Sequence, residues 1–465
     1  MGPLLTASCG LLLAALSLVP TRLSDSSSPV PNVPNIAAYF GTKSRYEEVN
    51  PNLLRDFVNQ TVLRPPPGES CSPVHVTAVI RHGTRYPTLK NIRRIHNLSA
   101  LVRTEGSDGS GWLRDLRRTR WEDVYPEHMD GQLAEKGRKD LRLLALRLSS
   151  LFPSLLSEEN MRTRRLRLLS SSKPRCVGSV EAFQDGLLQL HGRRHVPPEY
   201  VQQVDDGLMR FFERCRGYVD GVEKNRTALI EVVKFKHGDE MEALRRRTAE
   251  ILGVPLHRLT PDLVEAAFFL CSYELSIRSV LSPWCFLFDE SDAKVLEYKS
   301  DLKQFWKRFH GHRINSMSSC PLFHHVFRTL DKAGRPRRAT EAAPEPASIL
   351  VGHAETLLPL LSLLGLYKDP TPPTASNYQS QHGRSFRSSR IVPYAANLLF
   401  VLYDCQRGPR LQLLMNETPV RFPDLPDDTP LYRDVRAAYR HLLDGCDFHR
   451  ECEGRAEGRG PNTEL

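Results

Sequence analysis

The feature that most constrains this chain is the heptapeptide R-H-G-T-R-Y-P at residues 81–87, which directly follows an apolar, β-branched run at 74–80. Such a run predicts a buried strand. Charge begins at once where the strand ends: two arginines flank His82, and Gly83 lets the backbone approach a ligand closely. Open α/β folds bind their ligands at the carboxyl ends of sheet strands. Since guanidinium groups match phosphate oxygens, the segment predicts an anion site with His82 as a candidate nucleophile.

Two further loops of similar character follow predicted strands. Residues 166–169 predict a strand that ends in the polar, basic segment S-S-S-K-P-R at 170–175. Residues 348–351 predict another, which is followed by G-H-A-E at 352–355. Because parallel strands present their carboxyl ends at one edge of a sheet, we expect the three loops to converge. They would bring together Arg81, Arg85, Arg175, Lys173, His82, His353 and Glu355.

The order of the predicted elements indicates the fold class. Leucines recur at helical spacing over 137–152, and 179–190 is also helical in pattern, so strands and helices alternate. This alternation predicts an α/β fold with a doubly wound mixed sheet flanked by helices, into which a mainly helical domain is inserted. The predicted division is an α/β domain over 35–196 and 347–445, a helical insertion over 197–346 and a polar C-terminal tail over 446–465.

The N-terminal residues predict a signal peptide. Residues 4–19 form an apolar stretch too short to span a bilayer, and Ser- and Pro-rich sequence follows it. We therefore expect cleavage of residues 1–24, entry into the secretory pathway and no stable membrane span. The last four residues, Asn-Thr-Glu-Leu, are similar to a K-D-E-L retrieval signal in their final Glu-Leu. The lumen of the endoplasmic reticulum is the expected location, a retrieval receptor is a candidate partner, and secretion is the alternative.

Secretory entry makes disulfides the expected state of the cysteines. Nine of the ten cysteines lie outside the predicted signal peptide, and this odd number implies at least one free thiol. We predict pairing within three couples: Cys446 with Cys452, Cys271 with Cys285, and Cys71 with Cys405. Cys176, Cys215 and Cys320 remain unassigned. No C-x-x-C pair is present, which argues against a structural zinc site.

Four Asn-X-Ser/Thr triplets agree with a glycosylated secretory protein. They predict glycans at Asn59, Asn97, Asn225 and Asn416.

A net charge of +10, from 64 basic and 54 acidic side chains, suggests an anionic partner. Anionic small substrates, nucleic acid, and membrane or glycosaminoglycan surfaces all fit this balance, and charge alone does not separate them. The sequence contains no aromatic-interleaved basic motif and no nucleotide-type Gly-rich loop. We therefore expect a small anionic substrate and no nucleic acid.

The residues gathered at the predicted sheet edge suit phosphoryl transfer without a metal or other cofactor. The arginines would stabilise the charge on the transferring group. Neutral His82 would attack phosphorus and form a phosphohistidine, since nearby cations disfavour the protonated ring. Glu355 would protonate the leaving oxygen, and His353, at the start of a helix, would add a hydrogen-bond donor. Each residue also has a plainer explanation: Arg175 as a surface ion pair, His353 as a helix cap, Glu355 as a complement to the helix dipole, and Lys173 as a solvated side chain.

The pattern R-H-G-x-R-x-P at 81–87 resembles the phosphate-binding signature of the histidine acid phosphatases, the branch that includes phytases. Many members carry His-Asp at a second motif, whereas this chain has His-Ala-Glu at 353–355, a variant similar to that of the multiple inositol polyphosphate phosphatases. Segments 352–361, 391–395 and 282–285 look like that group too. The resemblance spans roughly residues 40 to 450 and its motifs are specific.

This resemblance implies an α/β domain with a helical insertion, no metal cofactor, and removal of phosphates from phytate-like inositol polyphosphates. It implies that His82 becomes phosphorylated and that Arg81 and Arg85 bind phosphate. Activity on 2,3-bisphosphoglycerate is a further implication. Two alternatives stay open: a broad-specificity acid phosphatase, and a secreted basic protein that binds polyanions while its phosphatase loops are inert.

Overall fold

The computed structural model describes residues 35–49, 69–107, 109, 111–191, 202–335 and 344–453. Its centre is a seven-stranded mixed sheet in the order β3-β2-β4-β1-β5-β6-β7. β3, β2, β4 and β1 run parallel, and β5, β6 and β7 are antiparallel to their neighbours. The strands are β1 (Cys71–Arg81), β2 (Leu166–Ser170), β3 (Gln203–Val204), β4 (Ala347–Gly352), β5 (Asn397–Cys405), β6 (Arg410–Met415) and β7 (Thr418–Val420). The expected doubly wound mixed sheet is confirmed.

Alternation along β1 divides the core into two layers, because successive strand residues point to opposite faces. Val76, Ala78 and Ile80 pack on one face, against α4 (Glu135–Leu151), α5 (Glu158–Arg162) and α6 (Pro174–His191). Val79 points to the other face, which a larger group of helices covers. These helices are α7 (Asp206–Met209), α8 (Phe211–Arg214), α9 (Arg216–Tyr218), α14 (Arg313–Met317), α15 (Cys320–Ala333), α16 (Ala354–Leu363), α17 (Ser388–Ile391), α18 (Tyr432–Ala438), α19 (Arg440–Gly445) and α20 (Phe448–Cys452).

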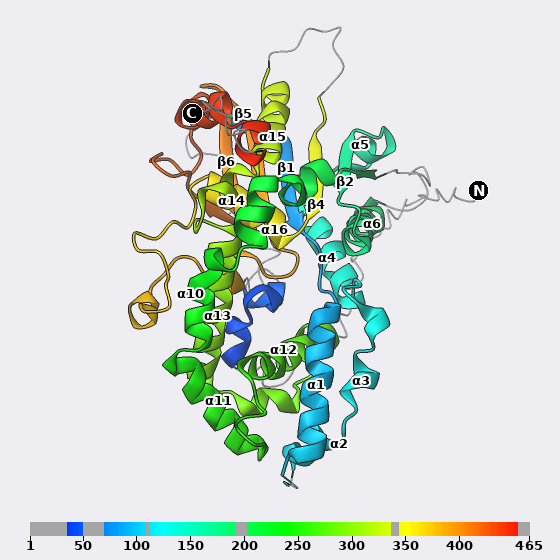
Figure 1. Ribbon diagram of the computed structural model, residues 1–465. Helices are drawn as coiled ribbons and strands as arrows, with labels where there is room; N and C mark the ends of the chain where they lie inside the picture. Colours follow the sequence, from blue (N-terminus) through cyan, green and yellow to red (C-terminus); the bar gives the residue numbers. More distant parts are fainter. Residues whose placement is uncertain are drawn as a thin grey trace, which may run out of the picture.

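A separate helical layer lies beyond one end of the sheet (Figure 1). It has its own apolar core, which includes Leu98, Phe268 and Trp284. Its helices are α1 (Leu89–Glu105), α2 (Trp112–Arg118), α3 (Trp121–Val124), α10 (Ile230–Lys236), α11 (Asp239–Leu252), α12 (Pro261–Arg278) and α13 (Glu290–Arg308). The helical layer therefore takes α1, α2 and α3 from the N-terminal part of the chain, while α14 and α15 from the middle pack on the sheet.

Local sequence sets the ends of the long helices in this layer. α12 begins where the Thr260 side chain accepts a hydrogen bond from the Leu263 amide, and Pro261 occupies its first turn. α13 begins with a reciprocal capping box between Asp289 and Asp292. α11 ends at Gly253, whose φ of +64° is the left-handed conformation that glycine adopts most readily. At its other end α13 reaches the loop after β4, where Arg308, its last residue, pairs with Glu355.

Four disulfides link distant elements. Cys71–Cys405 joins β1 to β5 and Cys271–Cys285 joins α12 to the segment after it, so these two predictions are confirmed. The predicted Cys446–Cys452 pair is wrong.

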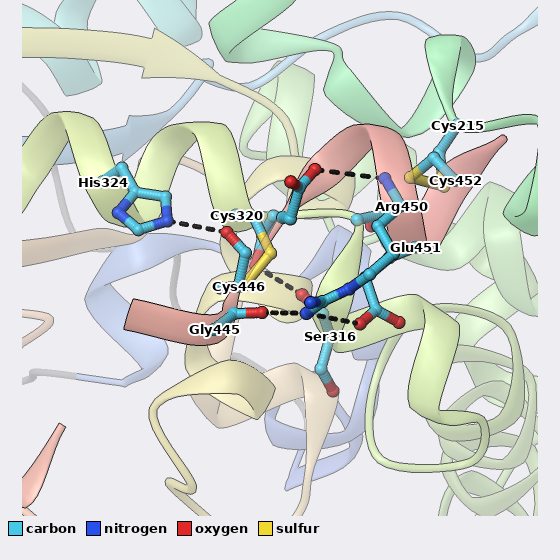
Figure 2. The surroundings of a disulfide bond; sticks show 12 residues. Cys215, Ser316, Cys320, His324, Gly445, Cys446, Arg450, Glu451 and Cys452 are labelled. Carbon is cyan, nitrogen blue, oxygen red and sulfur yellow. Dashed lines mark hydrogen bonds and ion pairs between the residues drawn. A yellow bond between two sulfur atoms is a disulfide. The ribbon is translucent and has the colours of Figure 1, made fainter. Parts of the chain in front are cut away.

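Cys446 directly follows α19, whereas Cys452 is the last residue of α20, and the two face different neighbours (Figure 2). Cys446 bonds to Cys320 on α15 and Cys452 bonds to Cys215 after α8. Proximity in sequence was misleading because a short helix points its two ends toward separate partners. Cys176 is the free cysteine of the described residues and is buried.

The prediction of a glycan at Asn416 does not fit the structure. Its side chain is 3% exposed and donates hydrogen bonds to the carbonyls of Arg390 and Ile391, so no glycan fits there. Asn97 is exposed on α1, and Asn225 is partly exposed. The predicted signal peptide at 1–24, Asn59 and the final residues 462–465 lie outside the described residues. Within the described residues, no helix combines the length and apolarity needed to cross a bilayer.

Candidate active site

The three loops predicted to converge do so at the carboxyl ends of β1, β2 and β4. These strands are parallel neighbours, with Arg81 opposite Gly352 and Ser170 opposite Val351. The ring centroids of His82 and His353 are 5.6 Å apart, and the rings meet edge to face. Two histidines that are 271 positions apart in the sequence therefore lie side by side, because the parallel strands before them end at the same edge of the sheet.

Close backbone packing fixes the loop that follows β1. The His82 amide donates to the Gly352 carbonyl, and the Gly83 amide donates to Ser179 Oγ. Asp140 on α4 accepts hydrogen bonds from both the amide and the hydroxyl of Thr84. A Cβ on Gly83 would lie 2.3 Å from the Gly137 carbonyl oxygen, so glycine is needed for this close approach. The loop is thus held from α4, α6 and β4.

A backbone contact fixes the orientation of the His82 ring. Its Nδ1 lies 2.9 Å from the Gly83 carbonyl oxygen, which can only accept. The neutral ring therefore carries its proton on Nδ1 and leaves the Nε2 lone pair free. Burial, followed by the charges of Arg81 and Arg175, holds the pKa of His82 well below its usual value. The ring is consequently neutral at physiological pH, which is the form that can attack phosphorus.

Three arginines surround His82, and each retains unpaired donors. Arg81 donates through Nη1 to the carbonyls of Thr42 and Val392, at 2.7 and 2.6 Å. Arg85 donates to the Tyr86 carbonyl at 2.8 Å. Among the residues the structure describes, none of Arg81, Arg85 and Arg175 forms an ion pair with a carboxylate, and the Nε of each is buried without a partner. Carbonyl acceptors hold the guanidinium groups of Arg81 and Arg85 in place while their charge remains available to an anion.

His353 sits between two side chains of the loop after β2. Its Nε2 is 2.9 Å from Ser171 Oγ, and its Nδ1 is 3.4 Å from Arg175 Nη2. Since a guanidinium group only donates, Nδ1 is the acceptor and Nε2 carries the proton. Burial is the main reason that the pKa of His353 falls to about 3, so this ring is also neutral. Cys176 Sγ lies 3.6 Å from Nε2 and packs beneath the ring.

Glu355, the expected proton donor, is ion-paired in the structure. Arg308 at the end of α13 approaches its Oε1 to 2.9 Å. Burial would raise the pKa of Glu355, but Arg308 and then His353 hold it well below its usual value. Glu355 is therefore an anion in the free site, and it can donate a proton only when its environment changes. The sequence did not single out Arg308, because nothing local separates it from the neighbouring Lys307.

The sequence reasoning also missed two lysines near the arginines. Lys43, in the 3-10 helix Gly41–Lys43, has its Nζ 3.6 Å from the ring centroid of Phe269. Burial lowers its pKa to about 7, with contributions from Lys303 and Arg85. Burial likewise lowers the pKa of Lys303 on α13 to about 8. Neither residue lies in a motif, and only the packing of the helical layer brings them here.

Lys173, expected to bind substrate, is less closely involved. Its backbone amide lies 3.4 Å from Ser171 Oγ, while its side chain makes no hydrogen bond or ion pair with other described residues. A substrate role for Lys173 stays a prediction. Arg81, Arg85, Arg175, His82 and His353 are brought together as expected, and Glu355 lies beside them.

Comparisons with known proteins agree with this geometry. Residues 74–417 match the family model described as histidine phosphatase superfamily, branch 2. A human protein named multiple inositol polyphosphate phosphatase 1 is 46% identical over 464 residues, covering 95% of this chain and 94% of that protein. Its Gallus gallus counterpart is 45% identical over 431 residues, covering 90% and 93%.

Solved structures share the fold at lower identity. A multiple inositol polyphosphate phosphatase from Bifidobacterium longum, solved with inositol hexasulfate, superposes with a TM-score of 0.70 at 15% identity, over 87% of this chain and 97% of that one. A phytase from D. castellii gives 0.72 at 16% identity, over 93% and 91%. These two structures therefore share the fold of this chain. The chain belongs to branch 2 of the histidine phosphatase superfamily, among the multiple inositol polyphosphate phosphatases.

Proposed function

We propose that this chain is a metal-independent phosphomonoesterase that removes phosphates from inositol polyphosphates through a phosphohistidine on His82. The single observation that carries the proposal is a neutral, buried imidazole with a free Nε2, surrounded by three arginines that lack carboxylate partners among the described residues. Relatives of high identity are named for this substrate class.

The proposed reaction has two steps. His82 Nε2 attacks phosphorus, the N–P bond forms and the ester P–O bond breaks, while Arg81, Arg85 and Arg175 stabilise the charge on the phosphoryl oxygens. The bound anionic substrate raises the pKa of Glu355 above its value in the free site, so Glu355 takes up a proton in the complex, and the leaving alkoxide takes that proton. Water then attacks phosphorus, the N–P bond breaks, and Glu355 takes back a proton. His353 helps to position Arg175, whose Nη2 lies 3.4 Å from His353 Nδ1.

Selectivity for substrates with several phosphates follows from the additional cations. Lys43 and Lys303 lie near the arginines, and burial lowers the pKa of these two lysines to about 7 and about 8. A further phosphate group beside them would favour their charged forms. A monophosphate would use the arginines alone, whereas further phosphates would meet these lysines. Activity on 2,3-bisphosphoglycerate, a smaller molecule with two phosphates, fits the same reasoning. We also propose residence in the lumen of the endoplasmic reticulum, which the four disulfides support.

The test is phosphate release from phytate in the presence of a chelator. The natural chain is expected to remain active, and His82→Ala is expected to lose activity and acid-trappable phosphoprotein. His449→Ala, at an exposed position on α20, is the matched control and should retain both. Loss of activity with chelator would refute metal independence, and labelled phosphoprotein in His82→Ala would remove His82 from the mechanism. Binding to polyanions without phosphate release would favour an inert polyanion-binding protein instead.

A further inference from the structure

A hollow lined by cationic side chains lies at the amino ends of β2 and β4, whereas the candidate active site lies at their carboxyl ends. It encloses about 190 Å³ between β2, α15 and the segment that leads into β4. Arg167, His325, Arg328, Lys332 and Glu345 contribute to its lining.

The hollow and the active site are at opposite ends of the same strands. Arg167 is the second residue of β2 and Glu345 precedes β4, whereas Ser171 and His353 follow the other ends of these strands. From Arg167 to Ser171 the strand rises about 13 Å, at roughly 3.3 Å per residue. Figure 1 shows α15 beside the sheet, with the helical layer beyond the sheet's other end. The hollow is therefore a separate site.

The side chains of the hollow carry a surplus of positive charge. Three cationic residues, Arg167, Arg328 and Lys332, face one carboxylate residue, Glu345. Within the part of the chain that the structure describes, none of these three cations has an ion-pair partner. Like charges held close together without counterions repel each other, and an anion between them would relieve this repulsion. A surplus of two positive charges matches a dianion.

Buried polar atoms without partners point to the same ligand. Arg167 Nε and His325 Nε2 are both buried and make no hydrogen bond with described residues. Arg167 alternates with Leu166 and Leu168, which pack on the other face of the sheet, so its side chain is directed to the face that α15 covers. Burial, and then the charges of Arg167 and Arg328, lower the pKa of His325 to about 4. Polar groups buried in this way ordinarily have a partner.

Hydrogen bonds within the protein hold the residues that line the hollow. The Glu345 carbonyl accepts a hydrogen bond from His75 Nδ1 at 2.7 Å, which fixes the segment before β4. Arg328 donates through Nε to the His324 carbonyl at 3.2 Å, and this bond leaves its terminal nitrogens for a ligand. The volume of about 190 Å³ lies below the roughly 300–1,000 Å³ of pockets that hold drug-sized ligands, so a whole inositol polyphosphate does not fit within the hollow.

We propose that this hollow binds one small tetrahedral dianion, hydrogen phosphate or sulfate, held by Arg167, Arg328 and Lys332. Under the proposed function, hydrogen phosphate is also the product released at the opposite edge of the sheet. The binding site itself does not depend on that activity. Its ligand links β2, α15 and the start of β4.

The test uses sulfate as the probe, because it is not turned over and remains a dianion across the working pH range. Equilibrium dialysis with radiolabelled sulfate at fixed ionic strength gives the number of sites. We expect two sites on the natural chain and one on Arg328→Gln/Lys332→Gln, both exposed positions on α15 whose exchange leaves the core intact. The matched control Lys90→Gln/Arg114→Gln removes two exposed charges from the helical layer and should retain both sites.

The site that survives in the α15 variant should be competed by phytate, and phosphate release should stay within about twofold of the natural chain. Arg167→Gln, measured separately, should weaken the second site at least tenfold. Either of two results would overturn the proposal. The natural chain could bind only one sulfate, or the α15 variant and Arg167→Gln could both retain two sulfate sites of unchanged affinity. Phosphate release is measured on the same variants. It can be lost while the second sulfate site remains, or the reverse, so failure of the proposed phosphatase function and failure of the proposed anion site are distinguishable.

Discussion

The ion pair between Arg308 and Glu355 makes a sharp prediction about the proton donor. In the free site Arg308 Nη2 lies 2.9 Å from Glu355 Oε1 and keeps this carboxyl ionised. Arg308→Gln removes the positive charge and retains a side chain that can donate a hydrogen bond. We expect the pKa of Glu355 to rise, because burial then acts against the anion with less opposition from neighbouring cations.

The expected size of the rise follows from the contact. An opposite charge at this range ordinarily lowers a carboxyl pKa by about 1–3 pH units. The side chain of Glu355 is 34% exposed, so solvent screens part of the interaction and the lower half of that range applies. We therefore expect a rise of about 1–2 pH units, equivalent to about 1.4–3 kcal/mol between the two protonation states.

The assay is the pH dependence of kcat/KM, which reports groups of the free enzyme. With phytate, whose leaving group is an alkoxide, activity should decline as pH rises above the pKa of Glu355, and Arg308→Gln should move that decline upward by about 1–2 pH units. With 4-nitrophenyl phosphate, whose leaving group needs no proton, the profile should not move. Arg308→Lys keeps the charge and should keep the natural profile. Glu355→Gln should slow the phytate reaction more than the aryl one.

Two results would refute this reasoning. An unmoved phytate profile in Arg308→Gln would mean that Glu355 does not titrate in catalysis. Equal movement with both substrates would mean that the group responsible acts on phosphate binding or on His82. A role for Arg308 in binding substrate would change KM at every pH and leave the position of the decline unaltered.

Three other substitutions probe the support of the site and of the fold. Gly137→Ala would place a Cβ 2.1 Å from the Thr84 carbonyl oxygen. We expect at least tenfold lower activity and an unfolding free energy, measured in urea, that is lower by about 1–3 kcal/mol. Unchanged activity would contradict the tight contact. Glu417→Gln leaves the buried guanidinium of Arg147 without its counter-charge and should lower the unfolding free energy by about 3–5 kcal/mol, whereas a loss below 1 kcal/mol would argue against the pair. Cys446→Ser should cost about 2–5 kcal/mol, and a non-reduced peptide map of the natural chain that joined the two C-terminal cysteines to each other would disprove the pairing.

The loops of the site could be predicted because the sequence pattern that marks each one lies within a few residues of it. Each lies directly after a short apolar run, and the rule that parallel strands align their carboxyl ends places the loops together. His82 and His353 meet for this reason alone. The resemblance of their motifs to a known family then gave them roles that spacing could not.

The position of Arg308 in the site depends on tertiary packing, which the sequence around Arg308 does not indicate. Arg308 and Lys307 are adjacent on α13, yet Arg308 pairs with Glu355 and Lys307 pairs with Glu223. Only the rotation of α13 against the sheet distinguishes them. The C-terminal disulfides depend on packing in the same way, because the placement of α19 and α20 decides which cysteine Cys446 and Cys452 can each reach.

A cluster of three arginines that form no ion pair with any described residue must be held together by the rest of the protein. Mutual repulsion and burial both oppose it, and burial lowers the pKa of Arg81 to about 10. The opposing stabilisation lies outside the pocket. Carbonyls of Thr42 and Val392 fix Arg81, and the pair of Arg147 with Glu417 joins α4 to the far strands of the sheet. A phosphate in the pocket relieves the repulsion, so it should stabilise the whole fold, by about 2.7 kcal/mol when present at one hundred times its dissociation constant. The unpaired charge that disfavours the empty pocket is therefore the same property that makes it bind phosphate.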